Sequence, residues 1–229
     1  MCRFLVGVAT ALMVLSLFFM SAPAFETAQP LVKKIYCAGP LFNAKEREEM
    51  EQIAVLLEKS GFRVFLPHRD GINLADLLDS FLANGVPHSK ALDILNKAIF
   101  YLDVFKVLDS DGLILNMNGR VPDEGAMVEA GIAWHAGKAI VIYSDDARSL
   151  VSGNDNPLVM GLSGFNKLSD INKIPQAFKA IFAAGTSPEK RSDLGTEGLV
   201  SKGRQILETL STKNNSKAVA RDLMQLLDR

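Results

Sequence analysis

A single acidic residue interrupts a helical run of small and apolar side chains in the segment 123–138. The segment reads DEGAMVEAGIAWHAGK, and Glu129 is the only charged residue between Ala126 and Trp134. A helix of this composition is packed on most sides, and an ionised carboxylate is costly there unless it is paired or used. The pattern therefore predicts that Glu129 is a reactive group and not a solvated surface acid.

Two further acids lie on either side of the strand-like segment 112–116, which precedes the Glu129 helix. Asp103 falls in the helix before this strand and Asp123 opens the helix after it. If both face one edge of the sheet, three carboxylates converge there, an arrangement suited to acid/base work combined with a nucleophile. Each has a simpler interpretation, since Asp123 could be an N-cap, or cap and bind at once, and Asp103 could be a solvated helix residue.

Strand-like and helical segments alternate along most of the chain. The predicted strands cover 33–38, 62–66, 112–116 and 139–143, and the clearest helices outside the Glu129 segment cover 44–60, 91–109 and 175–184. Such alternation is typical of a parallel sheet covered by helices. Ligands of open α/β sheets bind at the carboxyl ends of the strands, where the loop before the Glu129 helix would lie.

The segment 68–88 is harder to assign. Residues 72–82 have helical spacing, but Gly71, Gly85 and Pro87 interrupt the pattern. We therefore predict an excursion over the carboxyl edge of the sheet, where long insertions often cover a ligand and would set base preference.

The first 24 residues have the features of a secretory signal peptide. A short basic start precedes the apolar or small run 4–20, and Ser21–Ala24 supplies an A-x-A type cleavage site. We predict cleavage after Ala24, a secreted or periplasmic protein, and no membrane contact after cleavage. An uncleaved anchor is the alternative, because about 17 apolar residues almost span a bilayer.

The remaining chain is expected to contain one α/β domain over 33–185, followed by a polar linker and helical tail over 186–229. The linker is predicted over 186–202, with amphipathic segments around 204–210 and 217–227. The tail would either pack on a partner subunit or remain solvated and partly ordered.

Composition excludes several classes of function. The 229 residues carry 25 basic and 26 acidic side chains, a formal net charge of −1, so no polyanion-binding surface and no nucleic acid polymer partner is expected. The sequence has no H-E-x-x-H or C-x-x-C metal motif, no P-loop, and no G-x-G-x-x-G after the first strand. We therefore predict no metal and no cofactor. Once Cys2 leaves with the signal, Cys37 has no partner for an internal disulfide.

Four motifs, in order, resemble those of the nucleoside 2-deoxyribosyltransferase family. The first resembles the family's I-Y-x-A-G-P-x-F opening, the second its helix-to-strand aspartate pair, the third its D-x-G-x-x-x-E-x-G-x-A core and the fourth its late N-P-hydrophobe element. The matching segments are Ile35–Phe42, Asp103 with Asp111, Asp123–Ala133 and Asn156–Leu158. The resemblance covers about 33–161 and excludes the signal and the tail.

The resemblance implies a flavodoxin-like doubly wound parallel sheet, a Rossmann-like three-layer α/β/α arrangement, and base exchange on 2′-deoxynucleosides. Glu129 would attack the anomeric carbon, expel the base and form a glycosyl ester, while Tyr36 would lie beside it and orient it. Asp103 would protonate the departing base, and Asp123 would hold the sugar hydroxyls. Asn156 would bind the 5′-hydroxyl in a neighbour's site, which implies a homo-oligomer, a dimer or higher.

General chemistry supports this assignment without the family name. Cleavage of an N-glycosidic bond passes through an oxocarbenium-like sugar, which a nearby carboxylate can stabilise or trap as an ester. Gly39 and Gly125 are further candidates for substrate binding, although small residues such as Gly125 also suit ordinary helix-on-sheet packing. Phe42 could stack on a nucleobase. Relatives in the resembled family that hydrolyse 5′-monophosphates carry a serine- and arginine-containing first loop that binds phosphate. The loop 39–43 contains no cation, so the resemblance favours a free nucleoside over a nucleotide.

The predicted export leaves other functions open, because an acceptor base is less reliably supplied outside the cytoplasm. Simple hydrolysis of a deoxynucleoside is the nearest alternative. An exported nucleoside-binding module without turnover, and a glycohydrolase acting on another N-ribosyl compound such as a dinucleotide, are the others.

Overall fold

The computed structural model describes residues 31–119, 123–146, 155–185, 195–212 and 215–227. Residues up to Leu31 form a unit separate from Val32–Arg229, to which every element below belongs. The predicted signal peptide therefore lies outside the described residues. Among the helices of the described ranges, none combines the length and the apolar character needed to cross a membrane.

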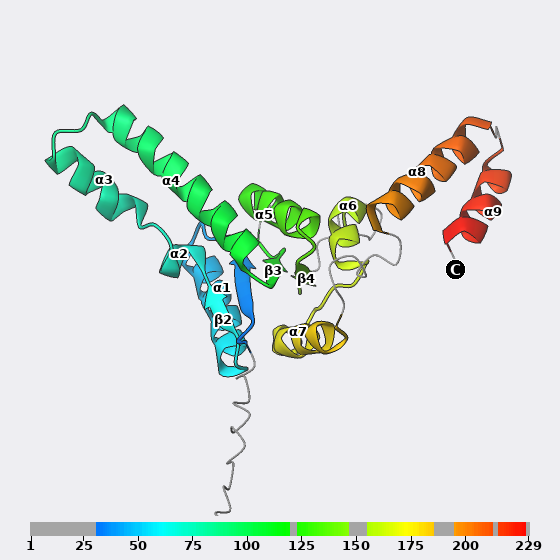
Figure 1. Cartoon of the computed structure of the whole chain (residues 1–229), viewed down its shortest axis with the longest axis horizontal. Coiled ribbons are helices and arrows are strands. Elements are labelled where there is room, and N and C mark those ends of the chain that lie inside the picture. The colour runs from blue at the N-terminus through cyan, green and yellow to red at the C-terminus, as the bar shows by residue number, and fades with distance from the viewer. Residues whose placement is uncertain (1–30, 120–122, 147–154, 186–194, 213–214, 228–229) are drawn as a thin grey trace, which may run out of the picture. The chain divides into compact units, whose positions relative to one another are not determined.

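Four parallel strands form the sheet that the described residues build (Figure 1). These strands are β1 (Lys34–Ala38), β2 (Arg63–Phe65), β3 (Gly112–Asn116) and β4 (Ala139–Tyr143), and their order is β2-β1-β3-β4. The order reverses between β1 and β3, so their carboxyl ends flank the switch point where ligands of such sheets bind. The predicted flavodoxin-like α/β fold is confirmed.

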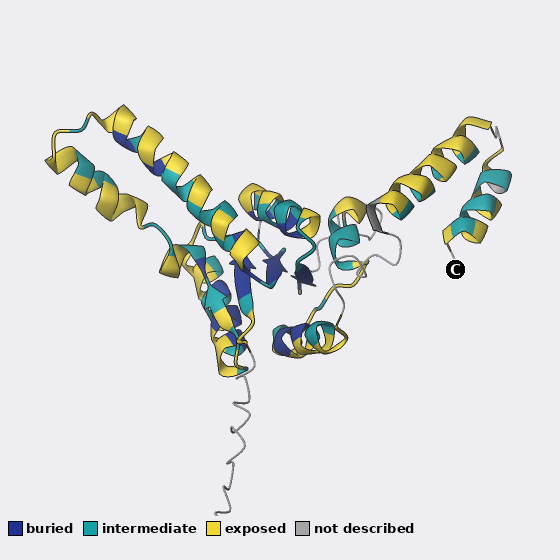
Figure 2. Ribbon diagram, viewed as in Figure 1, coloured by how far each residue is buried: buried dark blue, intermediate teal, exposed yellow. Residues whose placement is uncertain are grey.

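Helices cover both faces of this sheet because side chains alternate along each strand. Side chains of one parity pack with α1 (Ala44–Lys59) and α7 (Ile174–Ala183), and those of the other parity pack with α4 (His88–Asp109) and α5 (Glu124–His135). Figure 2 shows the strands as the most continuously buried part of the chain. Both faces are apolar, which explains why the strand segments read as uninterrupted hydrophobic runs.

Paired charges hold the amino edge of the sheet, opposite the predicted site. Asp111 accepts hydrogen bonds from the backbone N–H of Lys34 at 2.9 Å and from Lys33 Nζ at 2.8 Å. Lys34 Nζ also contacts Asp109 at 2.9 Å. Asp111, the second aspartate of the family-like pair, thus joins β1 to β3 and lies away from the carboxyl edge.

The segment predicted as an irregular excursion is mostly helical. It contains α2 (Pro67–Asp70) and α3 (Leu74–Ala83), and α3 packs against α4 as a hairpin. The glycines that obscured the pattern fall between these helices, and Gly85, with φ of +75°, terminates α3 in a conformation that favours glycine. Helix α4 begins at His88, three residues before the predicted start, because Pro87 serves as its N-cap.

The later elements are short except at the tail. After β4 come α6 (Pro157–Met160) and the 3-10 turns Gly161–Ser163 and Ile171–Lys173, which lead into α7. The tail contains α8 (Gly195–Thr212) and α9 (Ser216–Leu227), which pack on each other. The predicted linker was therefore wrong from residue 195 onward, because an amphipathic helix begins there.

Candidate active site

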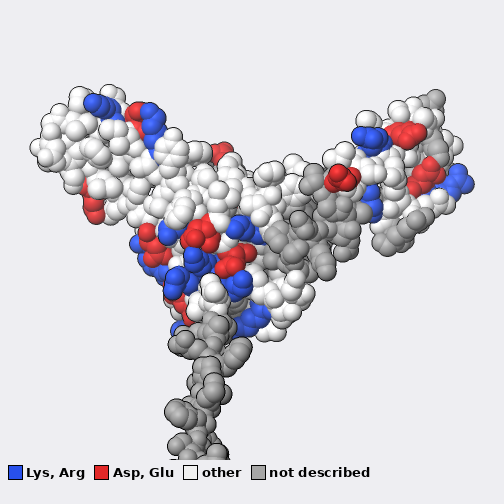
Figure 3. All heavy atoms as spheres, viewed as in Figure 1, with Lys and Arg blue, Asp and Glu red and all other residues white. Residues whose placement is uncertain are grey.

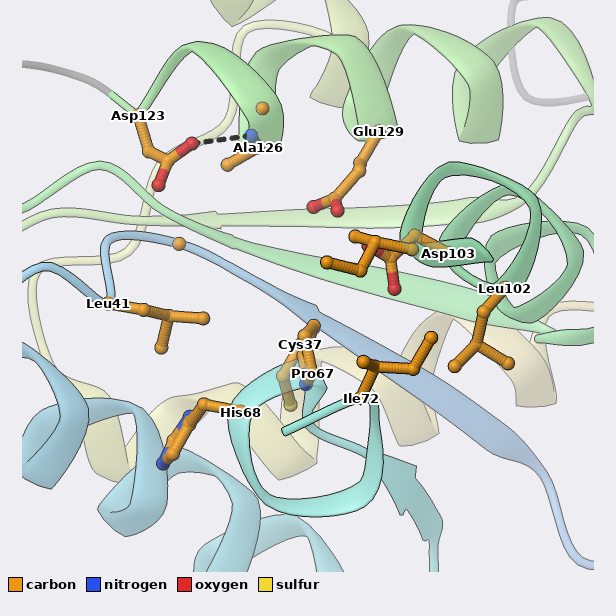
Figure 4. A pocket seen from close by; sticks show the side chains of 13 residues that line it. Cys37, Leu41, Pro67, His68, Ile72, Leu102, Asp103, Asp123, Ala126 and Glu129 are labelled. Carbon is orange, nitrogen blue, oxygen red and sulfur yellow. Dashed lines mark hydrogen bonds between the residues drawn. The ribbon is translucent and has the colours of Figure 1, made fainter. Parts of the chain in front are cut away.

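A cavity of about 260 Å³ lies at the carboxyl edge of the sheet, where the predicted reactive residues were expected. Its walls come from the chain just after β1 and β2 and from α4 and α5 (Figure 4). Asp103, Asp123 and Glu129 lie along one side. The structure thus brings together three carboxylates that are far apart in the sequence, because α4 and α5 pack side by side on one face of the sheet.

Tyr36 of β1 orients the Glu129 carboxylate through a hydrogen bond. Its hydroxyl donates a hydrogen bond of 2.6 Å to Glu129 Oε1. Tyr36 lies in the middle of β1 and is fully buried, with its ring stacked on Phe65 of β2. Burial, together with the charge of Glu129, raises the pKa of Tyr36 far above its ordinary value. The tyrosine therefore keeps its hydroxyl proton and can donate a hydrogen bond to the carboxylate over the whole physiological pH range.

The pKa of Glu129 is raised to about 8, chiefly by burial, and the charges of Asp103 and Asp123 act in the same direction. The hydrogen bond from Tyr36 acts in the opposite direction, because it stabilises the ionised form. Burial also raises the pKa of Asp103, while the nearby Tyr36 hydroxyl acts in the opposite direction. Near pH 7 the empty site therefore favours the protonated form of Glu129, and burial shifts Asp103 in the same direction, as a general acid requires.

Asp123 is an N-cap and a wall residue of the cavity at the same time. Its Oδ1 accepts a hydrogen bond of 2.9 Å from the backbone N–H of Ala126 and so caps the first turn of α5. In Figure 4 the other carboxylate oxygen points into the cavity. The cap orients the side chain, so that one oxygen serves the helix and the other can face a ligand.

The structure explains in two different ways why glycine occupies the candidate positions 39 and 125. A Cβ on Gly39 would lie 2.7 Å from Met50 Sδ and 2.9 Å from Asn116 Cβ, so close packing of β1 on α1 and β3 requires glycine there. A Cβ on Gly125 would lie 3.1 Å from Asp123 Oδ1. Glycine at 125 therefore leaves room for the capping oxygen of Asp123, whereas glycine at 39 shapes the cavity through the core.

Phe42 and Asn156 are not among the residues that line the cavity. The Phe42 side chain is 76% exposed, and its backbone N–H donates to Glu46 Oε2 at 2.9 Å. Asn156 caps α6, its Oδ1 accepting from the backbone N–H of Leu158 at 2.9 Å. Neither residue contributes to the cavity of its own chain in this structure.

The wall that faces the three acids is formed by residues that were not predicted as site residues, although the segment 68–88 was expected over this edge of the sheet. Pro67 and His68, directly after β2, and Ile72 form part of it, with Leu102 of α4 beside them (Figure 4). The His68 ring approaches Glu51, with Nε2 at 3.2 Å from Oε1. Position was the available signal, because residues that directly follow a strand of a parallel sheet lie at its ligand-binding edge.

Metal ligands do not gather anywhere in the described ranges. Their His, Cys, Asp and Glu side chains form no group of three or more that could hold a metal ion. Cys37 lines the cavity floor but is buried, and burial raises the pKa of its thiol far above the ordinary value, so it is protonated and unreactive at neutral pH.

The raised pKa of Glu129 predicts a pH-dependent stability that can be measured without any substrate. Glu129 binds its proton more tightly in the folded state, so its contribution to stability is present below pH 4.5, the ordinary pKa, and is lost as pH rises toward 8. Glu129→Gln, which cannot ionise, should therefore gain Tm over wild type as pH rises from 5 to 9, by on the order of 5 °C after allowance for solvent screening. Thermal melts across this range would measure the difference.

Glu124→Gln is the matched control for those melts. Glu124 lies exposed on the same helix, one residue after the N-cap. Its replacement should leave the difference from wild type nearly independent of pH over the same range. A constant difference for Glu129→Gln as well would contradict the raised pKa.

Several solved structures resemble this chain. A conserved protein from Enterococcus faecalis V583 is 24% identical, with a TM-score of 0.47, and the match covers 66% of this chain and 99% of that one. A 2-deoxyribosyltransferase from Bacillus psychrosaccharolyticus is 19% identical, with a TM-score of 0.43, over 62% of this chain and 90% of that one. The CMP N-glycosidase of Clostridium botulinum is 17% identical, with a TM-score of 0.38, over 65% and 99%. A search of the curated proteins found no match.

The family assignment comes from the sequence of the α/β region. The family model described as nucleoside 2-deoxyribosyltransferase matches residues 35–164, more than half of the chain. This range begins at Ile35 in β1, includes Tyr36, and contains the three carboxylates of the cavity. The chain therefore belongs to the nucleoside 2-deoxyribosyltransferase family.

Proposed function

We propose that this protein exchanges the base of 2′-deoxynucleosides through a glycosyl ester on Glu129. Family membership supports the broader statement that it is a nucleoside-processing enzyme of the deoxyribosyltransferase or N-glycosidase type. The finer assignment is supported above all by one observation, the 2.6 Å hydrogen bond that holds Glu129 from β1 while its carboxylate faces the cavity. An oriented carboxylate that is partly withdrawn from water is the group that attack on an anomeric carbon needs.

In the first half-reaction Glu129 reacts in its ionised form, which the hydrogen bond from Tyr36 stabilises, and one of its oxygens attacks C1′ of the deoxyribose. The C1′–O bond forms, the C1′–N bond breaks, and the electron pair of that bond passes to the base nitrogen. Asp103, whose pKa is raised by burial, gives its proton to the departing base. The product is a neutral base and a deoxyribosyl ester of Glu129.

The second half-reaction reverses these movements with a different base. A nitrogen of the incoming base attacks C1′, the ester C1′–O bond breaks, and its electrons return to the Glu129 carboxylate. Asp103, now ionised, takes the proton from the attacking nitrogen. Tyr36 stabilises the released carboxylate through its hydroxyl. The same hydrogen bond therefore acts on Glu129 both as the nucleophile of the first half-reaction and as the leaving group of the second.

The cavity is suited to an uncharged nucleoside. None of its described lining residues is a Lys or Arg, whereas three are acids, so a 5′-phosphate would meet repulsion without a counter-charge. A volume of about 260 Å³ lies near the lower end of small-molecule sites, which span roughly 300–1,000 Å³. Both features favour a single deoxynucleoside over a nucleotide or a dinucleotide.

A base-exchange assay tests the proposal directly. The protein from residue 25 onward is incubated with 2′-deoxyinosine, with and without adenine, and the products are separated by chromatography. We expect deoxyadenosine to form only when adenine is present, and 2′-deoxyinosine 5′-monophosphate and inosine to react at least tenfold more slowly. Free hypoxanthine as the only product would show hydrolysis and not transfer. Measurable affinity for deoxynucleosides without any turnover would favour a binding module.

We also propose that the protein is a homo-oligomer assembled through α4 and α5. Ile94, Tyr101, Phe105 and Leu108 recur at heptad-like spacing on α4 and are exposed, as is Val128 on α5. With adjacent Phe100 they expose roughly 600 Å² of apolar surface, taking about 150–250 Å² for a whole aromatic side chain.

That area is compatible with association of two copies. A single protomer contributes about 800 Å² to an interface of standard size, and the largest apolar patch on a monomer is about 300–600 Å². Charged side chains are sparse over this part of α4 in Figure 3, as expected for a surface that meets its own copy.

Light scattering after gel filtration measures the assembly. We expect a mass at least twice that of the protomer for wild type and a monomer for Phe105→Glu, whereas Lys90→Glu, on the exposed first turn of α4, should leave the mass unchanged. A monomeric wild type would overturn the proposal. Asn156, which does not line the cavity of its own chain, would in the oligomer be available to a neighbour.

The cellular location and chain organisation remain proposals of the same kind. We propose export, with cleavage after Ala24, a catalytic domain over 33–185 and a helical tail beyond it. Mass spectrometry of the protein recovered from the periplasm or medium of its native host should give an N-terminus at Phe25. An N-terminus at Met1 in a membrane fraction would indicate an uncleaved anchor.

A further inference from the structure

A network of polar side chains around two buried asparagines lies beside the cavity and takes no part in the chemistry proposed above. Its centre is Asn118, just after β3 and 7% exposed, next to Asn116, the last residue of β3 and fully buried. Glu49 of α1 and Asp145, two residues after β4, complete it. The asparagines and Asp145 lie at the carboxyl ends of β3 and β4, and none of the four side chains lines the cavity itself.

Every hydrogen-bonding position of the Asn118 amide is used. Its Nδ2 donates to Glu49 Oε1 at 2.8 Å and to Asp145 Oδ1 at 2.6 Å. Its Oδ1 accepts from the backbone N–H groups of Asp145 at 3.0 Å and Asp146 at 3.2 Å. The two carboxylates and two N–H groups define which end of the amide is which. Only asparagine meets this demand, since aspartate would bring a third carboxylate without a donor.

Asn116, at the end of β3, joins the same network. Its Nδ2 donates to Glu49 Oε2 at 2.9 Å, and its Oδ1 accepts from the backbone N–H of Asn118 at 2.9 Å. The two oxygens of Glu49 therefore join both asparagines. As a result α1, the chain after β3 and the chain after β4 are held to one another by charge-assisted hydrogen bonds.

The network is joined to the cavity by packing on one side and by the chain on the other. Asn116 packs so closely against Gly39, a cavity residue, that a Cβ there would lie 2.9 Å from Asn116 Cβ. Gly119, directly after Asn118, has a φ of +115° and lies against Pro40, with 3.3 Å from its Cβ position to Pro40 Cγ. Asp123 follows Asn118 by five residues. Asn118 is thus held by four hydrogen bonds at a position close to Asp123 in the sequence.

We propose that Asn118 is a positioning residue, which places Asp123 against the sugar by anchoring the chain after β3 to α1 and to the chain after β4. The inference rests on the proposed function, because it assigns Asp123 the sugar. Asn118 itself does not line the cavity, so it acts through Asp123 and touches no reacting atom.

A double-mutant cycle tests this coupling. The variants are Asn118→Ala, Asp123→Ser and the pair, with Ser chosen at 123 because it preserves the helix cap. We expect Asn118→Ala to raise KM for 2′-deoxyinosine about tenfold with kcat changed less than about threefold, and the pair to show the KM of Asp123→Ser alone within about twofold. Effects that multiply, or a loss confined to kcat, would overturn the inference. Asn118→Asp should be more impaired than Asn118→Ala, because it crowds three carboxylates.

Ser110→Ala is the matched control for general destabilisation. Ser110 is a buried residue at the opposite, amino end of β3, and its Oγ donates to the Lys106 carbonyl at 2.8 Å. It should lower Tm to a similar extent and leave KM unchanged. A comparable rise in KM for Ser110→Ala would remove the case for Asn118.

Affinities separate this inference from the proposed function. Calorimetric binding of 2′-deoxyinosine repeats the same cycle without turnover, and we expect the same non-additivity in Kd. If wild type binds 2′-deoxyinosine without turnover, the proposed reaction is refuted. The binding cycle would still show whether Asn118 acts through Asp123. A wild type that neither binds nor reacts would overturn both.

Discussion

Glu129→Ala should reduce kcat for base exchange by on the order of 10³-fold or more, while the Kd for 2′-deoxyinosine changes by less than about threefold. The carboxylate forms the bond to C1′, so its loss removes the covalent route, whereas most binding contacts come from the rest of the cavity. Single-turnover kinetics and calorimetry on the same preparations measure the two quantities.

Two further observations distinguish a lost nucleophile from a disturbed site. A high concentration of formate or azide should partly restore base release by Glu129→Ala, because a small anion can occupy the vacated space. Wild type stopped early in turnover should gain the mass of one deoxyribosyl group on the peptide that contains Glu129. Glu124→Ala, on the same helix but exposed, should retain wild-type rates. Substantial kcat in Glu129→Ala without added anion would refute the covalent mechanism.

Asp103→Asn should lower kcat for 2′-deoxyinosine by about 10²–10⁴-fold, the usual contribution of a general acid. Asparagine has nearly the same size but no transferable proton. The defect should depend on the leaving group, because an N7-methylated deoxyguanosine expels its base as a neutral molecule without a proton from the enzyme. We therefore expect that substrate to be cleaved by Asp103→Asn within about tenfold of the wild-type rate.

The comparison of the two substrates isolates proton donation from binding. Asp93→Asn, on the exposed side of the same helix and paired with Lys97, should behave as wild type with both. If Asp103→Asn were equally slow with both substrates, Asp103 would have to act through binding or through the Tyr36 and Glu129 pair, and another group would be the acid.

The sheet and the place of the reactive acid were accessible from the sequence for a simple reason. Buried parallel strands are continuous apolar runs, so β1, β3 and β4 stand out, and a lone carboxylate such as Glu129 stands out against the same apolar background. The N-cap role of Asp123 also has a local sequence signature. These features depend on near neighbours in the chain.

The remaining features depend on contacts between distant residues. Helix α3 is amphipathic but ends at glycine, and only its packing against α4 makes the pair a hairpin. His68 enters the cavity because β2 lies next to β1, which no local pattern reports. The Asn118 network joins residues 27 and 69 positions apart. Spacing along the chain carries no information about such pairs.

The three buried alanines of α5 have a consequence for how this enzyme could change. Ala126, Ala130 and Ala133 are the side chains on which the helix rests against the sheet, so they determine how far Glu129 stands from Tyr36 on β1. They act as a spacer layer one methyl group thick. Adding a single methylene to this layer would lift the carboxylate from its donor without altering any polar group. The reactivity of Glu129 thus depends partly on the size of three apolar side chains that carry no reactive group.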